Sequence, residues 1–355
     1  MNKVGIISQT MSRKISHMMF FLSVLVVYIH TYDNTLTEAT FREEQAIEDF
    51  ISQGFSRIAV PLFFMMSGYL HFSRPSLSTS ALAQQIPKKI TALAIPYLAW
   101  NILYTIFLFG TRMMAGQSVR VDNWIVFLLK AVFLYENNGA FWYVFQLLIL
   151  FALAPGLYNL YKKKHVGILM FICFFAMYLF IKERTKFFLL PGILFFSLGA
   201  MTALHGRHIV DQEYQQERIK KIGPRMAAGV FAILMLWRVQ LMDLNENISD
   251  LRDTVPYRLF EFAAPIAFWF ASDIVDFSKL SVKAWEKKSF FIYASHGIVL
   301  SAFNVVSKKL IPSTPIWRMI VYLTEPLIVV TVIVFIATVM KKYFPKTYRM
   351  LSGNR

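Results

Sequence analysis

Cysteine is almost missing from this chain, because Cys173 is the single one among 355 residues. The chain can therefore form no intramolecular disulfide and no cysteine cluster for a metal ion, and we expect no metal cofactor. Charged residues are also few, at 16% against about 25% in soluble domains. The sequence has no glycine-rich nucleotide loop, no G-x-S-x-G element and no zinc-ligand spacing. The sequence therefore lacks the common signatures of soluble enzymes.

Apolar residues dominate instead, at 56% of the chain with 34 phenylalanines. Runs long enough to span a bilayer occur at residues 16–32, 56–73, 88–111, 140–161, 166–182, 187–204, 225–241, 256–273, 289–307 and 316–340. No repeat, linker or appended soluble domain separates them. The sequence therefore predicts an all-α polytopic membrane bundle of about ten transmembrane helices, with residues 1–355 forming one domain.

The net charge of +16 is concentrated in short loops between the apolar runs. In a soluble protein such a charge would suggest nucleic acid, but here no soluble domain is predicted that would bind one, so we expect none. Basic loops alternate with less basic or acidic ones, such as Asp33–Asp49. By the positive-inside rule, the basic tails at about 1–15 and 341–355 face the cytoplasm. The first apolar run lacks a small-residue cleavage site and is predicted to remain as a span.

Residues 55–72 form the most informative segment. It has an arginine, Arg57, at one end and a Ser67-Gly68-Tyr69 break at the other. A charged group at membrane depth costs at least about 2.5 kcal/mol and commonly has a function. Arg57 is therefore a candidate for holding an anion or oxyanion, although an arginine that extends to the interface remains an alternative. The small-residue break favours either close helix packing or a ligand.

His30 lies at the predicted outer end of the first span, where Asp33 follows one helical turn later. A histidine titrates near neutrality and can act as a general base, and a carboxylate can orient its ring. The alternative is an interfacial histidine bonded to a neighbour. Tyr293 and His296 share one face of the ninth span, where a purely structural polar pair is the alternative. For the buried charges Arg238, Glu261 and Glu325, ion pairs between helices are expected.

Four segments of the sequence resemble the integral-membrane acyltransferase-3 family, whose members O-acylate bacterial surface polysaccharides. They are Val26–Thr31, Ser56-Arg-Ile-Ala-Val-Pro-Leu-Phe-Phe-Met-Met-Ser-Gly-Tyr-Leu70, Phe141-Trp-Tyr143 and Ser289-Phe-Phe-Ile-Tyr-Ala-Ser-His296. The likeness covers about residues 15–340 and is closest to the enterobacterial-common-antigen O-acetyltransferase type. One departure is Met19, because the family often has an arginine eleven residues before the first-helix histidine.

The resemblance implies a multi-pass protein of the bacterial inner membrane that uses cytoplasmic acyl-coenzyme A as co-substrate, with acetyl-coenzyme A as the expected donor. The implied acceptor is a hydroxyl group of a polysaccharide or lipid-linked sugar. His30 would be the general base and Arg57 the oxyanion or acceptor ligand. Trp142 and Tyr143 would form an outer sugar platform, and Tyr293 and His296 would line an inner cavity near the thioester. Ser67 and Tyr69 complete the predicted substrate-binding residues.

Two other functions compete with this interpretation. A transporter or flippase for a lipid-linked glycan would also need polar residues inside the bundle, but such proteins often contain paired repeats with broken helices, which the sequence lacks. A structural subunit of a polysaccharide-assembly complex would predict that replacing His30 leaves the chemistry unaffected. The sequence gives no oligomeric state.

Overall fold

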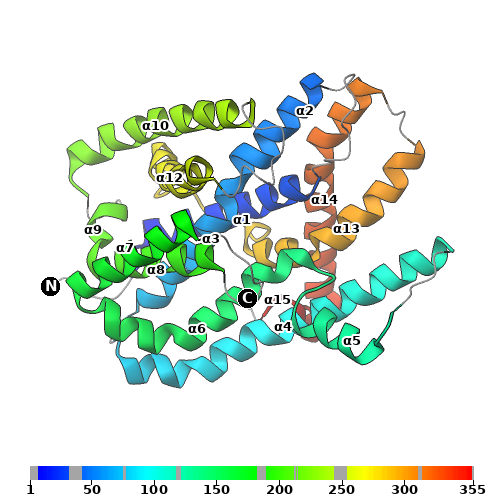
Figure 1. Cartoon of the computed structure of the whole chain (residues 1–355), viewed down its shortest axis with the longest axis horizontal. Helices are drawn as coiled ribbons and strands as arrows, with labels where there is room; N and C mark the ends of the chain where they lie inside the picture. Colours follow the sequence, from blue (N-terminus) through cyan, green and yellow to red (C-terminus); the bar gives the residue numbers. More distant parts are fainter. Residues whose placement is uncertain are drawn as a thin grey trace.

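The structure is a computed structural model, and it describes residues 7–31, 42–74, 77–116, 121–181, 189–211, 213, 215–243, 254–310 and 314–353. Within these residues the chain is helical and contains no β-strand. The main helices are α1 (Gln9–Thr31), α2 (Arg42–Glu48), α3 (Ala59–Phe72), α4 (Thr79–Met114), α5 (Trp124–Phe133), α6 (Trp142–Tyr161), α7 (Lys164–Phe180), α8 (Leu190–His205), α9 (Arg207–Val210), α10 (Glu217–Asp243), α12 (Val255–Ala271), α13 (Ser289–Leu310), α14 (Pro315–Tyr343) and α15 (Pro345–Ser352). The all-α prediction is confirmed (Figure 1).

Each predicted span falls on a helix, but the helices differ in their capacity to cross a bilayer. Among the described residues, six helical segments are long and apolar enough: α1, α4, α6 with its preceding 3-10 turn (Gly139–Phe141), α10, α13 with its preceding turn (Glu286–Lys288), and α14. The remaining predicted spans correspond to α3, α7, α8 and α12, each of 17 residues or fewer. Ten spans therefore stays a prediction, as does the orientation.

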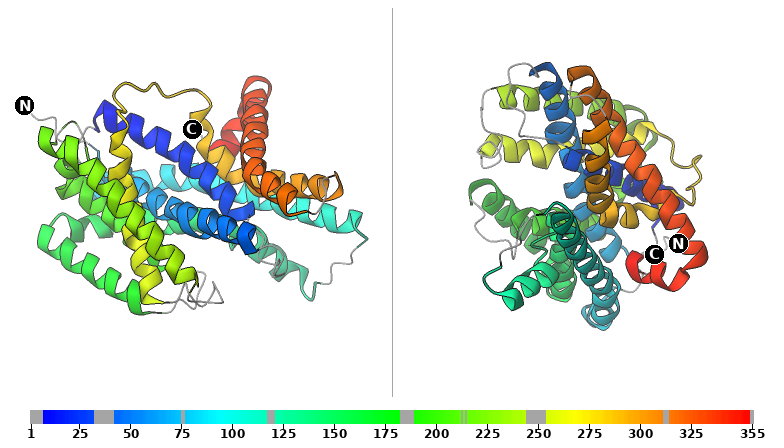
Figure 2. Two further views of the ribbon diagram at one scale, coloured as in Figure 1. Left: turned by 90° about the horizontal axis from the view of Figure 1, so that it is seen from above. Right: turned by 90° about the vertical axis from the view of Figure 1, so that its right-hand side faces the viewer.

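Helix α1 lies in the middle of the bundle, in contact with α3 on one side and with α13 and α14 on the other (Figures 1 and 2). Between α2 and α3 the chain forms a π-helical turn (Asp49–Gly54) and a 3-10 turn (Phe55–Ile58). Both turns contact α1. They bring Arg57 to the C-terminal end of α1, beside His30.

Helices α3 and α8 cross with their backbones in contact. A Cβ atom on Gly68 would lie 2.1 Å from the carbonyl oxygen of Phe196, and one on Gly199 would lie 2.0 Å from that of Met65. Only glycine permits such an approach. Helix α3 continues through Ser67-Gly68-Tyr69, so the predicted break is wrong. Gly68 serves helix packing, one of the two roles that the small residues predicted.

The C-terminal segment folds back against the bundle. Helix α15 buries Tyr348 and Leu351, and the indole Nε1 of Trp100 in α4 donates a hydrogen bond of 2.9 Å to the carbonyl oxygen of Leu351. The predicted basic tail at 341–355 is thus, up to residue 353, the end of α14 followed by a docked helix.

Candidate active site

A cavity of about 260 Å³ lies at the C-terminal end of α1, and we call it the His30 cavity. Its polar wall comes from helices far apart in the sequence. His30 belongs to α1, Arg57 to the 3-10 turn, Trp142 to the start of α6, Glu261 to α12 and Tyr293 to α13. The cavity therefore brings together a base, a cation, a carboxylate and two aromatic rings.

His30 is exposed to this cavity and stands beside a second imidazole. The ring centroids of His30 and His296 are 4.9 Å apart at an angle of 41°. The Nδ1 of His296 lies 2.6 Å from the carbonyl oxygen of Tyr293. Because a carbonyl only accepts, that nitrogen carries the proton, and in the neutral ring Nε2 is left as an acceptor. Asp33, the predicted orienting carboxylate, lies outside the described residues.

Hydrogen bonds to Gln53 orient Arg57, and Arg238 in turn bonds to the backbone of Gln53. Its Nε and Nη2 both donate to the side-chain oxygen of Gln53, with an Nε–oxygen distance of 3.1 Å. The backbone oxygen of Gln53 accepts in turn from Nε and Nη2 of Arg238, at 3.2 and 3.1 Å. Gln53 belongs to the π-helical turn, a feature that is frequent at functional sites.

Arg238 supports the π-helical turn from inside the bundle. The fully buried guanidinium donates to a backbone carbonyl and lies over the rings of Tyr257 and Phe260, at 5.0 and 5.9 Å from their centroids. A backbone carbonyl oxygen and two aromatic faces thus surround the Arg238 guanidinium. The expected ion pair of Arg238 stays a prediction.

Glu261 makes a structural contact between helices and, beyond its prediction, borders a cavity. It accepts a 2.6 Å hydrogen bond from the hydroxyl of Tyr178 in α7 and forms part of the His30 cavity wall. The sequence marks Glu261 as an intramembrane carboxylate but predicts only a structural ion pair for it. The structure adds it to the candidate site, because its carboxylate borders the same space as His30 and Arg57.

A second cavity, of about 310 Å³, borders α3, α4, α6 and α13, and we call it the His71 cavity. Its wall contains Ser67, His71, Arg74, Lys89 and Tyr143. It contains no carboxylate among the described residues. Partial burial lowers the pKa of the Arg74 guanidinium, which nevertheless stays protonated at neutral pH. This cavity is therefore suited to an anionic ligand.

Three polar residues of this cavity, Arg74, Lys89 and His71, are missing from the site that the sequence predicts. Of the three, His71 is the buried one. Its side chain is 4% exposed, and its ring lies 4.7 Å from that of Phe151. Within the described part of the chain, neither ring nitrogen of His71 has a hydrogen-bond partner. Buried polar groups normally have partners, so a ligand in the cavity would supply the missing one. The signal in the sequence was an ionisable residue one turn beyond Gly68.

Met19, which stands where the family often has an arginine, lines the His71 cavity. The nearby cations do not replace that arginine. Arg13 donates to the carbonyl oxygen of Ser278, and Lys14 forms a buried ion pair of 2.6 Å with Asp273. The cations of this cavity are instead Arg74, which follows α3, and Lys89 of α4.

The predicted site residues are thus only partly brought together. His30, Arg57, Trp142 and Tyr293 line the His30 cavity, whereas Ser67 and Tyr143 line the His71 cavity. The hydroxyls of Ser67 and Tyr143 are hydrogen-bonded at 3.0 Å. Tyr143 and Trp142, which the sequence assigns to one sugar platform, therefore border different cavities. His296 is buried behind His30 and lines neither cavity.

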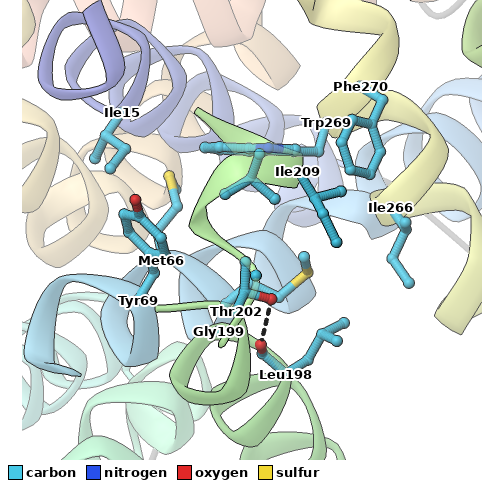
Figure 3. Close-up of a pocket in the computed structure, with 13 residues that line it drawn as sticks. Ile15, Met66, Tyr69, Leu198, Gly199, Thr202, Ile209, Ile266, Trp269 and Phe270 are labelled. Atoms are coloured by element: carbon cyan, nitrogen blue, oxygen red, sulfur yellow. Dashed lines mark hydrogen bonds between the residues drawn. The ribbon is translucent and has the colours of Figure 1, made fainter. Parts of the chain in front are cut away.

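Tyr69 lies in a third, largely apolar cavity of about 210 Å³ between α3, α8 and α12. Figure 3 shows it together with Leu198 and Thr202 of α8 and Trp269 of α12. The sole dashed bond drawn there joins the hydroxyl of Thr202 to the carbonyl oxygen of Leu198 within α8. Tyr69 is therefore separate from the other predicted substrate-binding residues.

Comparison with known families matches residues 15–340 to the model of the acyltransferase domain of the acyltransferase-3 family. This match covers nearly the whole chain and contains both polar cavities. No curated protein and no solved structure matches the chain.

Proposed function

Because the chain belongs to the acyltransferase-3 family of membrane acyltransferases, we propose that it is an O-acyltransferase, specifically an O-acetyltransferase. It transfers an acyl group from acyl-coenzyme A to a hydroxyl of a cell-envelope polysaccharide or lipid-linked sugar. The observation that carries this proposal is the pair of chemically different cavities that meet at Tyr293. One contains cations and, among the residues that the structure describes, no carboxylate. The other contains a potential base and an oxyanion ligand.

The His71 cavity is the donor site in this proposal. Coenzyme A carries phosphate groups, and charge-assisted bonds from Arg74 and Lys89 would hold them or the adjoining polar chain. A partly desolvated cation such as Arg74 gains from an incoming anion. His71, whose ring nitrogens have no partner among the described residues, would bond to the same ligand. These residues supply the positive charge that Met19 cannot.

The His30 cavity is the acceptor site. The face of Trp142 suits the apolar face of a sugar ring, and the carboxylate of Glu261 can accept hydrogen bonds from sugar hydroxyls. His30 takes the proton of the reacting hydroxyl. Arg57 donates to the oxygen on which negative charge develops.

In the proposed reaction, the acceptor oxygen displaces the coenzyme A thiolate from the acyl carbon in one step. The acceptor oxygen forms a bond to the thioester carbonyl carbon while its proton moves to His30. The carbon–sulfur bond breaks, and the coenzyme A thiolate leaves with the electron pair. The imidazolium of His30 returns its proton to the thiolate, directly or through water. The enzyme is thereby restored, and the products are an ester and free coenzyme A.

We further propose that both chain termini face the cytoplasm of a bacterial inner membrane, so that the donor cavity opens inward. Cysteine labelling tests this in a Cys173→Ser background, because Cys173 is exposed. Ala46 and Ser80 are both exposed, whereas Ser52 is fully buried and unsuitable. An impermeant reagent applied from outside should label Ala46→Cys and leave Ser80→Cys unlabelled. The reverse pattern would place the donor cavity outside and contradict the proposal.

The function is tested by supplying labelled acetyl-coenzyme A to membranes that contain the protein and by following the label into envelope glycans. We expect ester-linked label that mild alkali releases, and its loss in the His30→Ala protein at equal abundance. Label that never reaches a glycan, or that reaches it equally with His30→Ala, would contradict the proposal. Glycan translocation without acylation would identify a transporter.

A further inference from the structure

Tyr293 separates the two polar cavities. Among the described residues it is the one side chain that lines both of them. On the two neighbouring helices, adjacent residues line opposite cavities. Phe63 of α3 and Tyr143 of α6 line the His71 cavity. Phe64 of α3 and Trp142 of α6 line the His30 cavity. A single aromatic layer thus stands between a donor space and an acceptor space.

The ring of Tyr293 is fixed from several directions. Its hydroxyl donates a hydrogen bond to the carbonyl oxygen of Ala140. Its ring stacks on Phe141 at 5.9 Å and 24° and meets the edge of Tyr143 at 5.7 Å and 75°. The side chain is 4% exposed. A group that crosses between the cavities at Tyr293 would have to displace this ring and break its hydrogen bond.

We propose that Tyr293 restricts transfer to short acyl groups. This inference rests on the proposed function, in which coenzyme A and the sugar occupy opposite cavities and the acyl group alone has to cross. The opening that Tyr293 leaves when it turns is comparable to one phenol ring. An acetyl group is smaller than that ring, whereas a longer chain meets Phe63, Phe141 and Tyr143. One extra methylene in a fitted space changes kcat/KM by roughly 10- to 200-fold.

The experiment compares acetyl-, butyryl- and hexanoyl-coenzyme A as labelled donors, with membranes from the producing cells supplying the glycan acceptor. The variants are Tyr293→Leu and, as a matched control, Phe291→Leu. Phe291 is an equally buried aromatic on α13 that packs against Trp100 and Tyr348 and lines neither polar cavity. We expect the acetyl-to-hexanoyl ratio of transfer rates to fall at least about 10-fold in Tyr293→Leu and to keep its wild-type value in Phe291→Leu.

Tyr293→Phe separates ring volume from the hydroxyl, because it loses the bond to Ala140 but keeps the ring. It should retain the wild-type chain-length preference. If Tyr293→Leu does not accumulate, Tyr293→Met provides the same loss of ring. Wild-type acetyl transfer combined with an unchanged length profile in Tyr293→Leu or Tyr293→Met would overturn this inference alone. Relaxed selection in Tyr293→Phe or in Phe291→Leu would also overturn it. If the wild type transfers no acyl group from any of the donors, the proposed function itself is wrong.

Discussion

The two polar cavities differ in the sign and variety of their charges. The His30 cavity contains a carboxylate, Glu261, as well as the cation Arg57, and hydrogen bonds to other side chains hold both groups in place. In the His71 cavity Arg74 and Lys89 are cationic, and its described wall has no carboxylate. A mixed, pre-oriented set of groups suits proton transfer and the binding of a neutral polar molecule. An all-cationic set suits the binding of an anion.

Under the proposed function, this difference assigns donor binding and proton transfer to different parts of the bundle. Changes to His30 and Arg57 should therefore lower kcat, and a change to Glu261 should raise the KM for the acceptor. Changes in the His71 cavity should weaken donor binding and raise the KM for acetyl-coenzyme A. Four substitutions test this division.

The largest effect is expected from His30→Ala, which removes the proposed base. Loss of a general base typically lowers the rate by 10²–10⁴-fold. The protein should still insert and accumulate, because His30 is exposed to the cavity and contributes little to the buried core. Initial rates of acetyl transfer, normalised to protein abundance, measure the effect. A near-normal rate would remove His30 from the mechanism and end the functional contrast between the cavities.

Arg57→Lys should lower kcat by roughly 10²–10³-fold although the charge is kept. A planar guanidinium has five N–H donors, so it can donate to an oxyanion while Nε and Nη2 bind Gln53. An ammonium group cannot copy that geometry. The measurement is kcat at saturating acetyl-coenzyme A. Full activity of Arg57→Lys would show that this site needs positive charge without a defined orientation.

Lys89→Ala should raise the KM for acetyl-coenzyme A by about 10- to 100-fold, because a hydrogen bond to a charged group contributes roughly 1.5–3 kcal/mol. Its kcat should stay close to the wild-type value. The adjacent Lys88 is exposed and lines no polar cavity, so Lys88→Ala is the matched control and should leave KM unchanged. Equal effects of the two changes would mean that surface charge, and not the His71 cavity, attracts the donor.

The smallest effect is expected from Glu261→Gln. The amide oxygen can still accept the bond from Tyr178, so the helices should keep their positions. A lost hydrogen bond to the acceptor contributes about 1 kcal/mol, or roughly fivefold in the KM for the acceptor. The KM for acetyl-coenzyme A should not change. A change in the donor KM alone would place the donor in the His30 cavity and reverse the assignment of the two cavities.

Much of the candidate site could be predicted from the sequence because ionisable residues inside apolar runs are rare and conspicuous. His30 and Arg57 do line one cavity, and the antiparallel succession of their spans was enough to place them together. The roles of Trp142 and Tyr143 were harder to assign. Consecutive helical residues point in directions about 100° apart, so two adjacent aromatics lie in different cavities, and only the positions of α3 and α13 decide which.

The sequence by itself determined the helical class and the location of the helices. Long apolar runs leave backbone groups that only helices or closed barrels can satisfy in a bilayer, and each predicted run is found on a helix. Only the tertiary structure decided which faces meet. The rotation and crossing of packed helices place His71 and Lys89 in one cavity and Tyr293 between two cavities. They also bring Arg238 within hydrogen-bond distance of Gln53. Local sequence does not fix that rotation, because nearly every face of these helices is apolar and fits either lipid or a neighbouring helix.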